Sequence, residues 1–504
     1  MVKCEKLAKQ RGEKMKVEGN DWFYTKEVKE HFMNPKNFLK DELEVKDFNA
    51  YGKVGNMKCG DVMELWLKIE KNKIKDVRWR TFGSLHPDEK ILIGDYSYQE
   101  VKNIKIGDTI IDGSGQPNLI ENVITKKNSG KLLTFTLSTS SFYNITLTPN
   151  HTVPAIKRKD VALINRKTAR WSEVSSEKVN KVSAQMYSAS ELKKGDFLLF
   201  HPPKHTKDNS MFTNDLCTLL GYYVSDGSSP SKNRIIYYFG LNETNYIEEI
   251  ISICKKNNWS TKKYKRNTEN VICVQINEPK IAHFMKLHGG VPGKKQFSQD
   301  VMYLPPKKQI KIIDAYIKGD GWITQQDEKW QPQYFISTSI EKIANQLQLM
   351  LARNKIFAPL HYRPPRQFTS RGKTYINNGE INLIFRKNTA YSRIKYSTKE
   401  NAFLIPISQI SAYQYSGKVI DLSLIQAPHI YRTKGISMHN CASAIASTSA
   451  MSEMIKGMAL NKALKLTASD IMAKLKGLPA IKVHCSVLGD QALREAIKDY
   501  EKKN

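Results

Sequence analysis

Residues able to break a peptide bond stand at two places that are far apart in this sequence. Ser84 follows Gly83 at the first, and Asn440 and Cys441 follow His439 at the second. A peptide bond is stabilised by resonance and does not break unaided. A hydroxyl or a thiol can take over an acyl group, and an asparagine amide can attack its own carbonyl. These residues could therefore sever two peptide bonds and join the outer segments, although either group alone is also an ordinary loop.

Two other segments, 219–227 and 312–321, share a pattern of apolar and small residues that ends in Asp-Gly. Each predicts a helix, because glycine directly after the last polar residue is a typical helix-end signal. Packing the two helices together would bring Asp226 and Asp320 to one place. Two carboxylates there can bind Mg²⁺ and activate water against a phosphodiester. For either segment alone, a capped core helix is the alternative.

Three of the seven cysteines, Cys59, Cys441 and Cys485, lie in polar surroundings, with Asp61 and His484 as neighbours. Thiolates with an imidazole suit iron–sulfur clusters or zinc. Each cysteine alone is as readily a small core residue. Seven widely spread cysteines do not make a disulfide framework, and a reducing cytoplasm fits them.

Composition sets the limits for the whole chain. The 504 residues are 40% hydrophobic, which predicts a globular chain of about three domains. Of the net charge of +30, a share of +21 falls on residues 84–440. A polyanion such as DNA is a plausible partner for that segment, unless the whole proteome is rich in lysine. The sequence has no run of about 18 apolar residues and starts without a signal-peptide core, so we expect a cytoplasmic protein without a membrane span.

The elements that must position these residues follow from periodicity. Residues 23–35 predict a short helix that stops before a proline, and residues 62–69 and 74–80 alternate like two strands. Residues 442–475 and 490–502 have helical spacing, with an apolar face formed by Leu460, Ala463, Leu464 and Leu466. Strands followed by helices predict an α+β domain.

Removal of residues 84–440 joins Thr81-Phe82-Gly83 to Cys441-Ala442-Ser443. The joined string resembles the cysteine loop of IscU/NifU-type iron–sulfur scaffold proteins, although that family usually has glycine at Ala442. Segment 478–482 is similar to the family's chaperone-docking motif. The resemblance implies a scaffold for a [2Fe–2S] cluster, or for iron or zinc, with a cysteine desulfurase and an Hsp70-type chaperone as partners. Its implied metal-site residues are Cys59, Asp61, Cys441, His484 and Cys485.

The removed piece resembles an intein. Thr148-Pro149-Asn150-His151 is similar to the T-x-x-H block, and segments 419–424 and 429–440 are similar to the C-terminal blocks. The resemblance implies that Thr148 and His151 act on the upstream scissile amide, where Ser84 replaces the commoner cysteine. It also implies that Asp421 and His429 assist acyl transfer to Cys441, and that His439 assists cyclisation of Asn440.

The two Asp-Gly segments resemble the repeated motif of LAGLIDADG homing endonucleases. The resemblance implies double-stranded DNA at the intein insertion site as substrate, Asp226 and Asp320 as Mg²⁺ ligands, and Lys295 as a catalytic lysine. A solvated basic run is the alternative for Lys295. Two basic, aromatic stretches, 362–366 and 386–396, suit contacts with DNA phosphates and grooves, or a charged solvent face.

The sequence therefore predicts a multidomain chain, in which an α+β scaffold is split by a mostly β splicing (Hint) domain that itself carries an α/β endonuclease. The expected function is self-splicing, which releases residues 84–440 as an intein and ligates the scaffold. The alternative is a stable fusion of a metal-binding module with a DNA-binding or nuclease protein, without splicing. The predicted parts are 1–83 and 441–504 (scaffold), 84–204 and 398–440 (splicing domain), and 211–397 (endonuclease).

Overall fold

The computed structural model describes most of residues 25–503. It leaves out 34, 40–41, 57–60, 81–83, 139–143, 166–169, 267–269, 325–330, 371–372, 378, 389–393, 427–429, 440–441 and 478–483. Internal contacts divide the chain into two units. The described parts of the first lie within 25–55, 63–80 and 442–503, and the second consists chiefly of the segment between residues 82 and 441. No described helix is long and apolar enough to cross a membrane.

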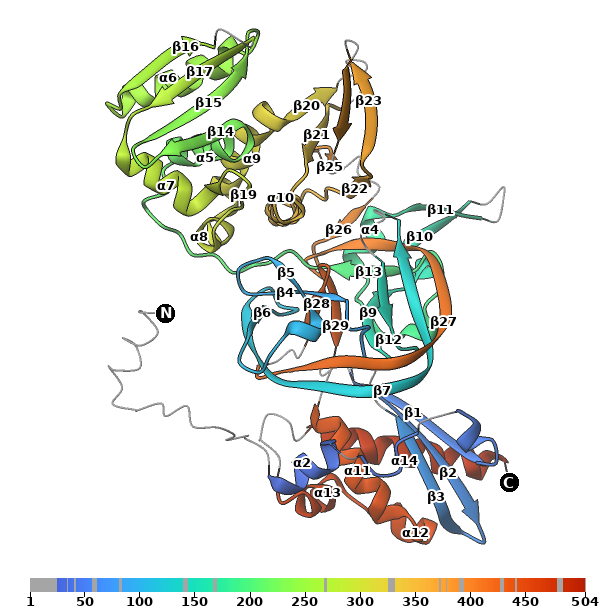
Figure 1. Cartoon of the computed structure of the whole chain (residues 1–504). Helices are drawn as coiled ribbons and strands as arrows, with labels where there is room; N and C mark the ends of the chain where they lie inside the picture. Colours follow the sequence, from blue (N-terminus) through green and yellow to red (C-terminus); the bar gives the residue numbers. More distant parts are fainter. Residues whose placement is uncertain are drawn as a thin grey trace, which may run out of the picture. The chain divides into compact units, whose positions relative to one another are not determined.

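The first unit contains a three-stranded sheet in the order β1-β2-β3 (Figure 1). Its strands are β1 (Ala50–Asn56), β2 (Asp61–Glu70) and β3 (Lys73–Arg80). Met63, Leu65 and Leu67 alternate along β2 and are fully buried, as the two-residue period of a strand with one covered face requires. The helices are α2 (Lys26–Met33), α11 (Ala442–Ile455), α12 (Leu460–Ala463), α13 (Ala468–Lys474) and α14 (His484–Lys503).

The expected strands and the first helix of this unit are therefore present, but the predicted helical region 442–475 consists of three separate helices. The first break lies at Gly457, whose φ of +85° no continuous helix allows. There the backbone turns to pair with β3: Gly457 N donates to Ile74 O at 2.7 Å, and Ile74 N donates to Met458 O at 2.9 Å. A tertiary contact thus overrides helical spacing.

The two sequence segments of this unit build one core. Ile445 and Ala446 of α11 and Leu493 of α14 are fully buried together with the apolar face of the sheet. A Cβ atom on Gly52 of β1 would collide with the backbone of α14, so strand and helix lie in close contact. Polar contacts also cross the insertion, since Thr25 Oγ1 donates to Leu475 O at 2.6 Å.

The second unit contains a strand-rich part with a twelve-stranded sheet. Its path runs β5-β4-β28-β29-β13-β27-β7-β6, and β8, β9, β12 and β26 pair off that path. Strands β7 (Pro117–Leu137) and β27 (Ala402–Leu424) are very long, pair antiparallel and curve together (Figure 1). The others are β4 (Lys90–Leu92), β5 (Tyr98–Glu100), β6 (Thr109–Ile111), β8 (Ile145–Leu147), β9 (Thr152–Ile156), β12 (Gln185–Ser188), β13 (Phe197–Phe200), β26 (Lys395–Ser397), β28 (Ile430–Thr433) and β29 (Ile436–His439).

The helix-containing part of the second unit repeats one pattern. Helix α5 (Asn214–Asp226) leads into the sheet β14-β15-β17-β16, and helix α9 (Pro306–Asp320) leads into the sheet β20-β21-β25-β22. The first sheet comprises Gly227–Ser231, Arg234–Gly240, Val271–Ile276 and Thr261–Lys265, in that order. The second comprises Gly321–Thr324, Gln333–Thr338, Glu380–Phe385 and Leu360–Arg363. The surrounding helices are α6 (Thr244–Lys256), α7 (Pro279–Gly289), α8 (Gln299–Tyr303) and α10 (Glu341–Arg353).

Candidate functional site

Ser84 begins a short extended segment that lies between two strands of the strand-rich part. Leu85 pairs antiparallel with Leu147 on one side and with Ile420 on the other. Leu85 and Ile420 exchange hydrogen bonds of 2.8 and 3.0 Å. One residue further in these registers, Ser84 stands across from Thr148 on one side and from Asp421 on the other. Directly opposed residues of an antiparallel pair share a face, so these three predicted site residues lie together.

The nitrogen of the Gly83–Ser84 peptide bond has a direct partner. Ser84 N donates to Thr148 Oγ1 at 2.9 Å, and Thr148 N donates back to Ser84 O at 2.9 Å. Ser84 is only 4% exposed and Thr148 only 7%, so water competes little for these bonds. This contact agrees with the role that the resemblance implies for Thr148 at the scissile amide, and the role that it implies for His151 there stays a prediction.

His151 lies on the same turn as Thr148 and is fully buried. Its backbone N donates to Thr148 O at 3.0 Å. Its ring meets the ring of Tyr431 at 6.4 Å between centroids, with 72° between the planes. Tyr431 in turn donates its hydroxyl to Asp421 Oδ1 at 2.9 Å, and Asp421 is fully buried as well. We call Ser84, Thr148, His151, Asp421 and Tyr431 the junction cluster.

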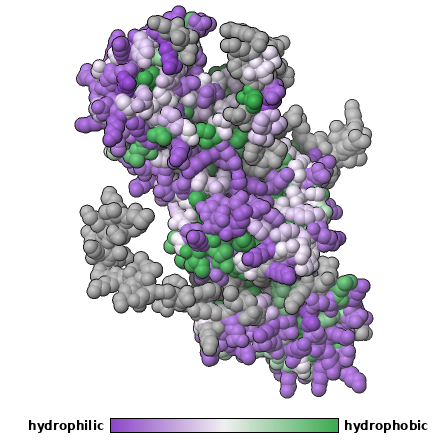
Figure 2. Space-filling model, in the orientation of Figure 1, coloured by the Kyte–Doolittle hydropathy of each residue, from purple (hydrophilic) through white to green (hydrophobic). Residues whose placement is uncertain are grey.

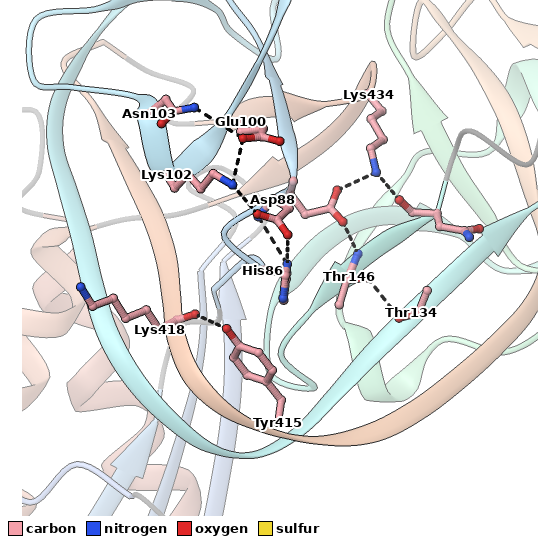
Figure 3. A network of polar contacts seen from close by, with 12 residues as sticks. His86, Asp88, Glu100, Lys102, Asn103, Thr134, Thr146, Tyr415, Lys418 and Lys434 are labelled. Atoms are coloured by element: carbon pink, nitrogen blue, oxygen red, sulfur yellow. Dashed lines mark hydrogen bonds and ion pairs between the residues drawn. The ribbon is translucent and has the colours of Figure 1, made fainter. Parts of the chain in front are cut away.

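A second buried acid, Glu89, anchors the segment that follows Ser84. Its carboxylate accepts hydrogen bonds from Thr146 N at 2.8 Å and from Thr433 Oγ1 at 3.2 Å, and it lies 3.1 Å from Lys434 Nζ. Glu89 thereby ties the start of the insertion to β8, which precedes Thr148, and to β28, which carries Tyr431. Asp88, Glu100 and Lys102 form a separate ionic group nearby (Figure 3).

Strand β29 leads toward the downstream junction and is anchored internally. Ser437 Oγ lies 2.7 Å from His201 Nδ1, and the guanidinium of Arg432 donates to the backbone oxygens of His201 and Gly113. Burial lowers the pKa of His201 to about 3, so this histidine is neutral at physiological pH. The strand ends at His439. Its side chain, together with His429, Asn440 and Cys441, lies outside the described residues.

The predicted pair of acids meets at the ends of helices α5 and α9. A Cβ on Gly221 of α5 would collide with Ile312 O and Ala315 Cβ of α9, so the helices approach at their backbones. A Cβ on Gly319 would collide with the Asp226 carboxylate, which places that carboxylate beside Asp320.

Both helices do end before glycine, as predicted, but not through the left-handed conformation. The φ angles of Gly227 and Gly321 are −95° and −131°. A Cβ on Gly227 would lie 2.6 Å from Tyr223 Cα, and a Cβ on Gly321 would lie 2.6 Å from Ile317 O. Glycine is therefore needed at these two positions for space.

Burial raises the proton affinity of both acids. Burial, followed by the charge of Asp320, raises the pKa of Asp226 to about 7. Burial also raises the pKa of Asp320, although a hydrogen bond of 3.3 Å from Tyr316 and the charge of Lys295 oppose the shift. Two buried carboxylates that resist joint ionisation form a set of hard oxygen ligands that suits a divalent cation.

Lys295 is close to this pair. Its ammonium donates to the backbone oxygens of Tyr223, Val224 and Gly227, at the C-terminal end of α5, and lies 4.6 Å from the Tyr223 ring centroid. Burial lowers its pKa to about 8, while the two acids oppose that shift. The alternative of a solvated basic run therefore does not describe Lys295. We call Asp226, Asp320 and Lys295 the acidic centre.

The residues of the two basic stretches, 362–366 and 386–396, lie in different parts of the second unit. Arg363 lies on exposed strand β22 and pairs with Glu380 at 3.4 Å, and Lys387 pairs with Asp314 at 2.7 Å. Lys395 and Tyr396 belong to β26 in the strand-rich part, and residues 389–393 are not described. On the face drawn in Figure 2, hydrophilic residues cover most of the surface that is not grey.

The predicted cluster residues can be placed only in part. Cys59 and Cys441 lie outside the described residues, and so do the side chains of Asp61, His484 and Cys485. The backbone of Asp61 begins β2, and that of His484 and Cys485 begins α14. Among the residues that are described, no three His, Cys, Asp or Glu side chains gather as a metal site.

Family comparisons match the chain in two places. The NifU-like N terminal domain matches residues 23–88 and 431–504, on both sides of the insertion and overlapping its ends. These two matches give one NifU-like domain in two parts, separated by an insertion. A LAGLIDADG-like domain matches residues 307–390 inside that insertion. This range contains Asp320 and the second repeat, whereas Asp226 and Lys295 precede it.

Two curated relatives align with the chain over very different lengths. NifU of Nostoc sp. is 57% identical over 60 residues, which are 12% of this chain and 20% of that protein. The iron-sulfur cluster assembly SufBD family protein Mb1496 of Mycobacterium bovis is 23% identical over 380 residues. That alignment covers 72% of this chain but 43% of the relative, so the chain spans less than half the length of the first relatives it matches.

Solved structures align with parts of the insertion. I-DmoI in complex with DNA and Ca is 10% identical with a TM-score of 0.24, over 35% of this chain and 85% of that one. The gp41-1 intein is 18% identical with a TM-score of 0.16, over 24% of this chain and 68% of that one. Scores this low establish no shared fold.

Proposed function

We propose that the chain is a precursor that excises residues 84–440 and ligates residues 1–83 to 441–504. The observation that carries the proposal is the junction cluster, which gathers Ser84, Thr148 and Asp421 from three distant segments in one buried sheet. The products would be an insertion of 357 residues and a NifU-like domain of 147 residues.

The first step follows from the contacts of Ser84. Its hydroxyl attacks the Gly83 carbonyl carbon, an ester bond forms, and the Gly83–Ser84 C–N bond breaks to leave a free amine. The departing nitrogen gains a lone pair and must receive a proton. The Thr148 hydroxyl, 2.9 Å from that nitrogen, now accepts a hydrogen bond and can rotate to donate one.

The later steps use the downstream junction. The Cys441 thiolate attacks the ester carbonyl, which gives a thioester and restores the Ser84 hydroxyl, with Asp421 as the buried acceptor of the thiol proton. The Asn440 side-chain nitrogen attacks its own carbonyl carbon, closes a succinimide and releases the Cys441 amine. That amine displaces the thiolate and forms the new peptide bond. His429 assists the acyl transfer to Cys441, and His439 assists the cyclisation of Asn440.

We propose further that the insertion is a site-specific endonuclease for double-stranded DNA. The Asp226 and Asp320 carboxylates would hold Mg²⁺, which when bound activates water and stabilises the leaving oxygen. Lys295 orients the end of α5 through three backbone oxygens and places a positive charge beside the acids. The net basic charge of the insertion favours approach to DNA.

The ligated NifU-like domain would serve as a scaffold on which iron–sulfur clusters are assembled as cargo. Cys59, Asp61, Cys441, His484 and Cys485 are its proposed ligands or their neighbours. A [2Fe–2S] cluster is the expected cargo, and a cysteine desulfurase and an Hsp70-type chaperone are the proposed partners.

Mass spectrometry of the expressed chain tests the proposal, because ligation gives a 147-residue product. Ser84→Ala should stop upstream cleavage, since it removes the acyl acceptor. Asn440→Ala should stop downstream cleavage, since it removes the cyclising amide. Full splicing in either variant, or an intact wild-type chain of 504 residues, would contradict the proposal and favour the stable fusion.

A further inference from the structure

Tyr431 lies within segment 429–440, but neither the resemblance nor the proposed steps assign a role to its side chain. It lies on β28, is fully buried, and stands opposite Met438 on β29, the strand that leads toward the downstream junction. Its ring contacts the His151 ring, and its hydroxyl donates to Asp421 Oδ1 at 2.9 Å. One side chain thus contacts groups assigned to both junctions.

The hydrogen bond from Tyr431 restricts the orientation of the buried Asp421 carboxylate. Asp421 Oδ1 also accepts from Leu422 N at 2.9 Å, so one carboxylate oxygen receives two donors. Rotation about the terminal torsion of an aspartate is otherwise broad. In a buried sheet, removal of one donor therefore leaves the direction of the carboxylate much less determined.

We propose that Tyr431 is a positioning residue whose hydroxyl holds the Asp421 carboxylate toward Ser84 and thereby favours acyl transfer over premature downstream cleavage. The inference rests on the proposed splicing function. Asp421 takes part in acyl transfer, whereas cyclisation of Asn440 proceeds at the end of β29. Loss of the hydroxyl alone should slow the first process and leave the second running.

The experiment compares Tyr431→Phe with Tyr98→Phe in the full chain. The Tyr98 hydroxyl is also buried, in the same sheet, but has no hydrogen-bond partner among the described residues. Mass spectrometry at successive times gives the amounts of ligated 147-residue product and of free segment 441–504. We expect Tyr431→Phe to raise the ratio of free segment to ligated product about tenfold or more, because a hydrogen bond to a charged group is lost.

Tyr98→Phe should leave that ratio unchanged. In an Asp421→Asn background, Tyr431→Phe should add little, because the two residues act as one unit. A loss of folding would instead reduce both products together, and thermal unfolding of each variant detects it. If Tyr431→Phe gives the same ratio of free segment to ligated product as the wild-type chain, the inference about Tyr431 is wrong. The proposed function still stands in that case, provided that the wild-type chain splices. A wild-type chain that never splices overturns both.

Discussion

The junction cluster and the acidic centre solve the problem of burying polar groups in opposite ways. The junction cluster relies on fixed donors and acceptors at 2.9 to 3.0 Å on strands, and its neighbour Glu89 has its charge matched by Lys434. The acidic centre gathers two carboxylates at the ends of two helices, and burial together with mutual repulsion raises the pKa of Asp226 to about 7.

The difference indicates what each site needs from its surroundings. A network of short hydrogen bonds holds its groups in place before any reaction, and any change in it misplaces atoms. Two neighbouring buried carboxyl groups resist simultaneous ionisation, and a bound cation would remove that resistance. The two sites should therefore respond separately to mutation, metal and pH.

The largest difference between the effects on DNA cleavage and on splicing is expected from Asp226→Asn or Asp320→Asn. Loss of a metal-binding carboxylate should reduce DNA cleavage by roughly 10³-fold or more while splicing continues unchanged. The assay is cleavage of a plasmid that carries the joined gene without the insertion. Asp215→Asn is the control, since this acid lies on the same helix but pairs with Lys256. Unchanged cleavage in the double variant would exclude a two-carboxylate mechanism.

Thr148→Ala should produce the reverse pattern. Removal of the hydroxyl beside the scissile nitrogen should slow upstream cleavage about a hundredfold, as loss of a preorganised donor does elsewhere. DNA cleavage should not change. Thr134→Ala provides the control, because the Thr134 hydroxyl contacts Thr146, 3.1 Å away, and not the junction (Figure 3). If both variants spliced at the wild-type rate, Thr148 would have no part in the first step.

Stability against pH distinguishes the two sites without any turnover. The raised pKa of Asp226 means that the folded state binds a proton more tightly than the unfolded state, whose ordinary value is 3.8. Its contribution is therefore fully present below about pH 4 and is lost as the pH rises through about 7. Without divalent metal, Asp226→Asn should stabilise the insertion at pH 8 by roughly 2–4 kcal/mol and by little at pH 4.

Denaturant unfolding at the two pH values, with EDTA present, measures this effect. Added Mg²⁺ should stabilise the wild-type chain at pH 8 and not the Asp226→Asn variant. A variant that gained as much stability at pH 4 as at pH 8 would show that charge is not the cause.

The smallest expected effect concerns Glu89→Gln, which keeps the shape but removes the charge beside Lys434. Loss of one buried charge-assisted contact should lower the free energy of unfolding by about 1–2 kcal/mol. The exposed pair of Lys102 and Asp88 supplies the comparison, since Lys102→Met should leave the free energy of unfolding nearly unchanged. Equal effects in the two variants would mean that burial of Glu89 does not matter.

Local patterns in the sequence predicted the parts of this molecule that local rules determine. Strands β2 and β3 follow from two-residue alternation, and the ends of α5 and α9 follow from Asp226-Gly227 and Asp320-Gly321. The division of the NifU-like domain could be predicted from the sequence because each half contains its own motifs. Residue types at fixed spacing carry such information without any knowledge of the fold.

Contacts between distant segments were not predictable in the same way. The register that sets Ser84 between Thr148 and Asp421 depends on pairing across more than 300 residues. The proposed positioning role of Tyr431 depends on a hydrogen bond from its hydroxyl to Asp421 on another strand, and no sequence motif predicts that contact. The sequence left two interpretations open for Lys295, a catalytic lysine or part of a solvated basic run, because the backbone oxygens that receive its ammonium come from the distant end of α5.

The shared core of residues 25–80 and 442–503 has a consequence for chain entropy. In the unspliced chain, 361 residues connect Arg80 to Ala442, and in the proposed ligated product four residues do. Closing a long loop costs conformational entropy that grows with the logarithm of its length. For a fully flexible connection the difference between these lengths is about 4 kcal/mol, and a folded insertion reduces it. Excision would thus stabilise the NifU-like domain without adding a single contact to its core.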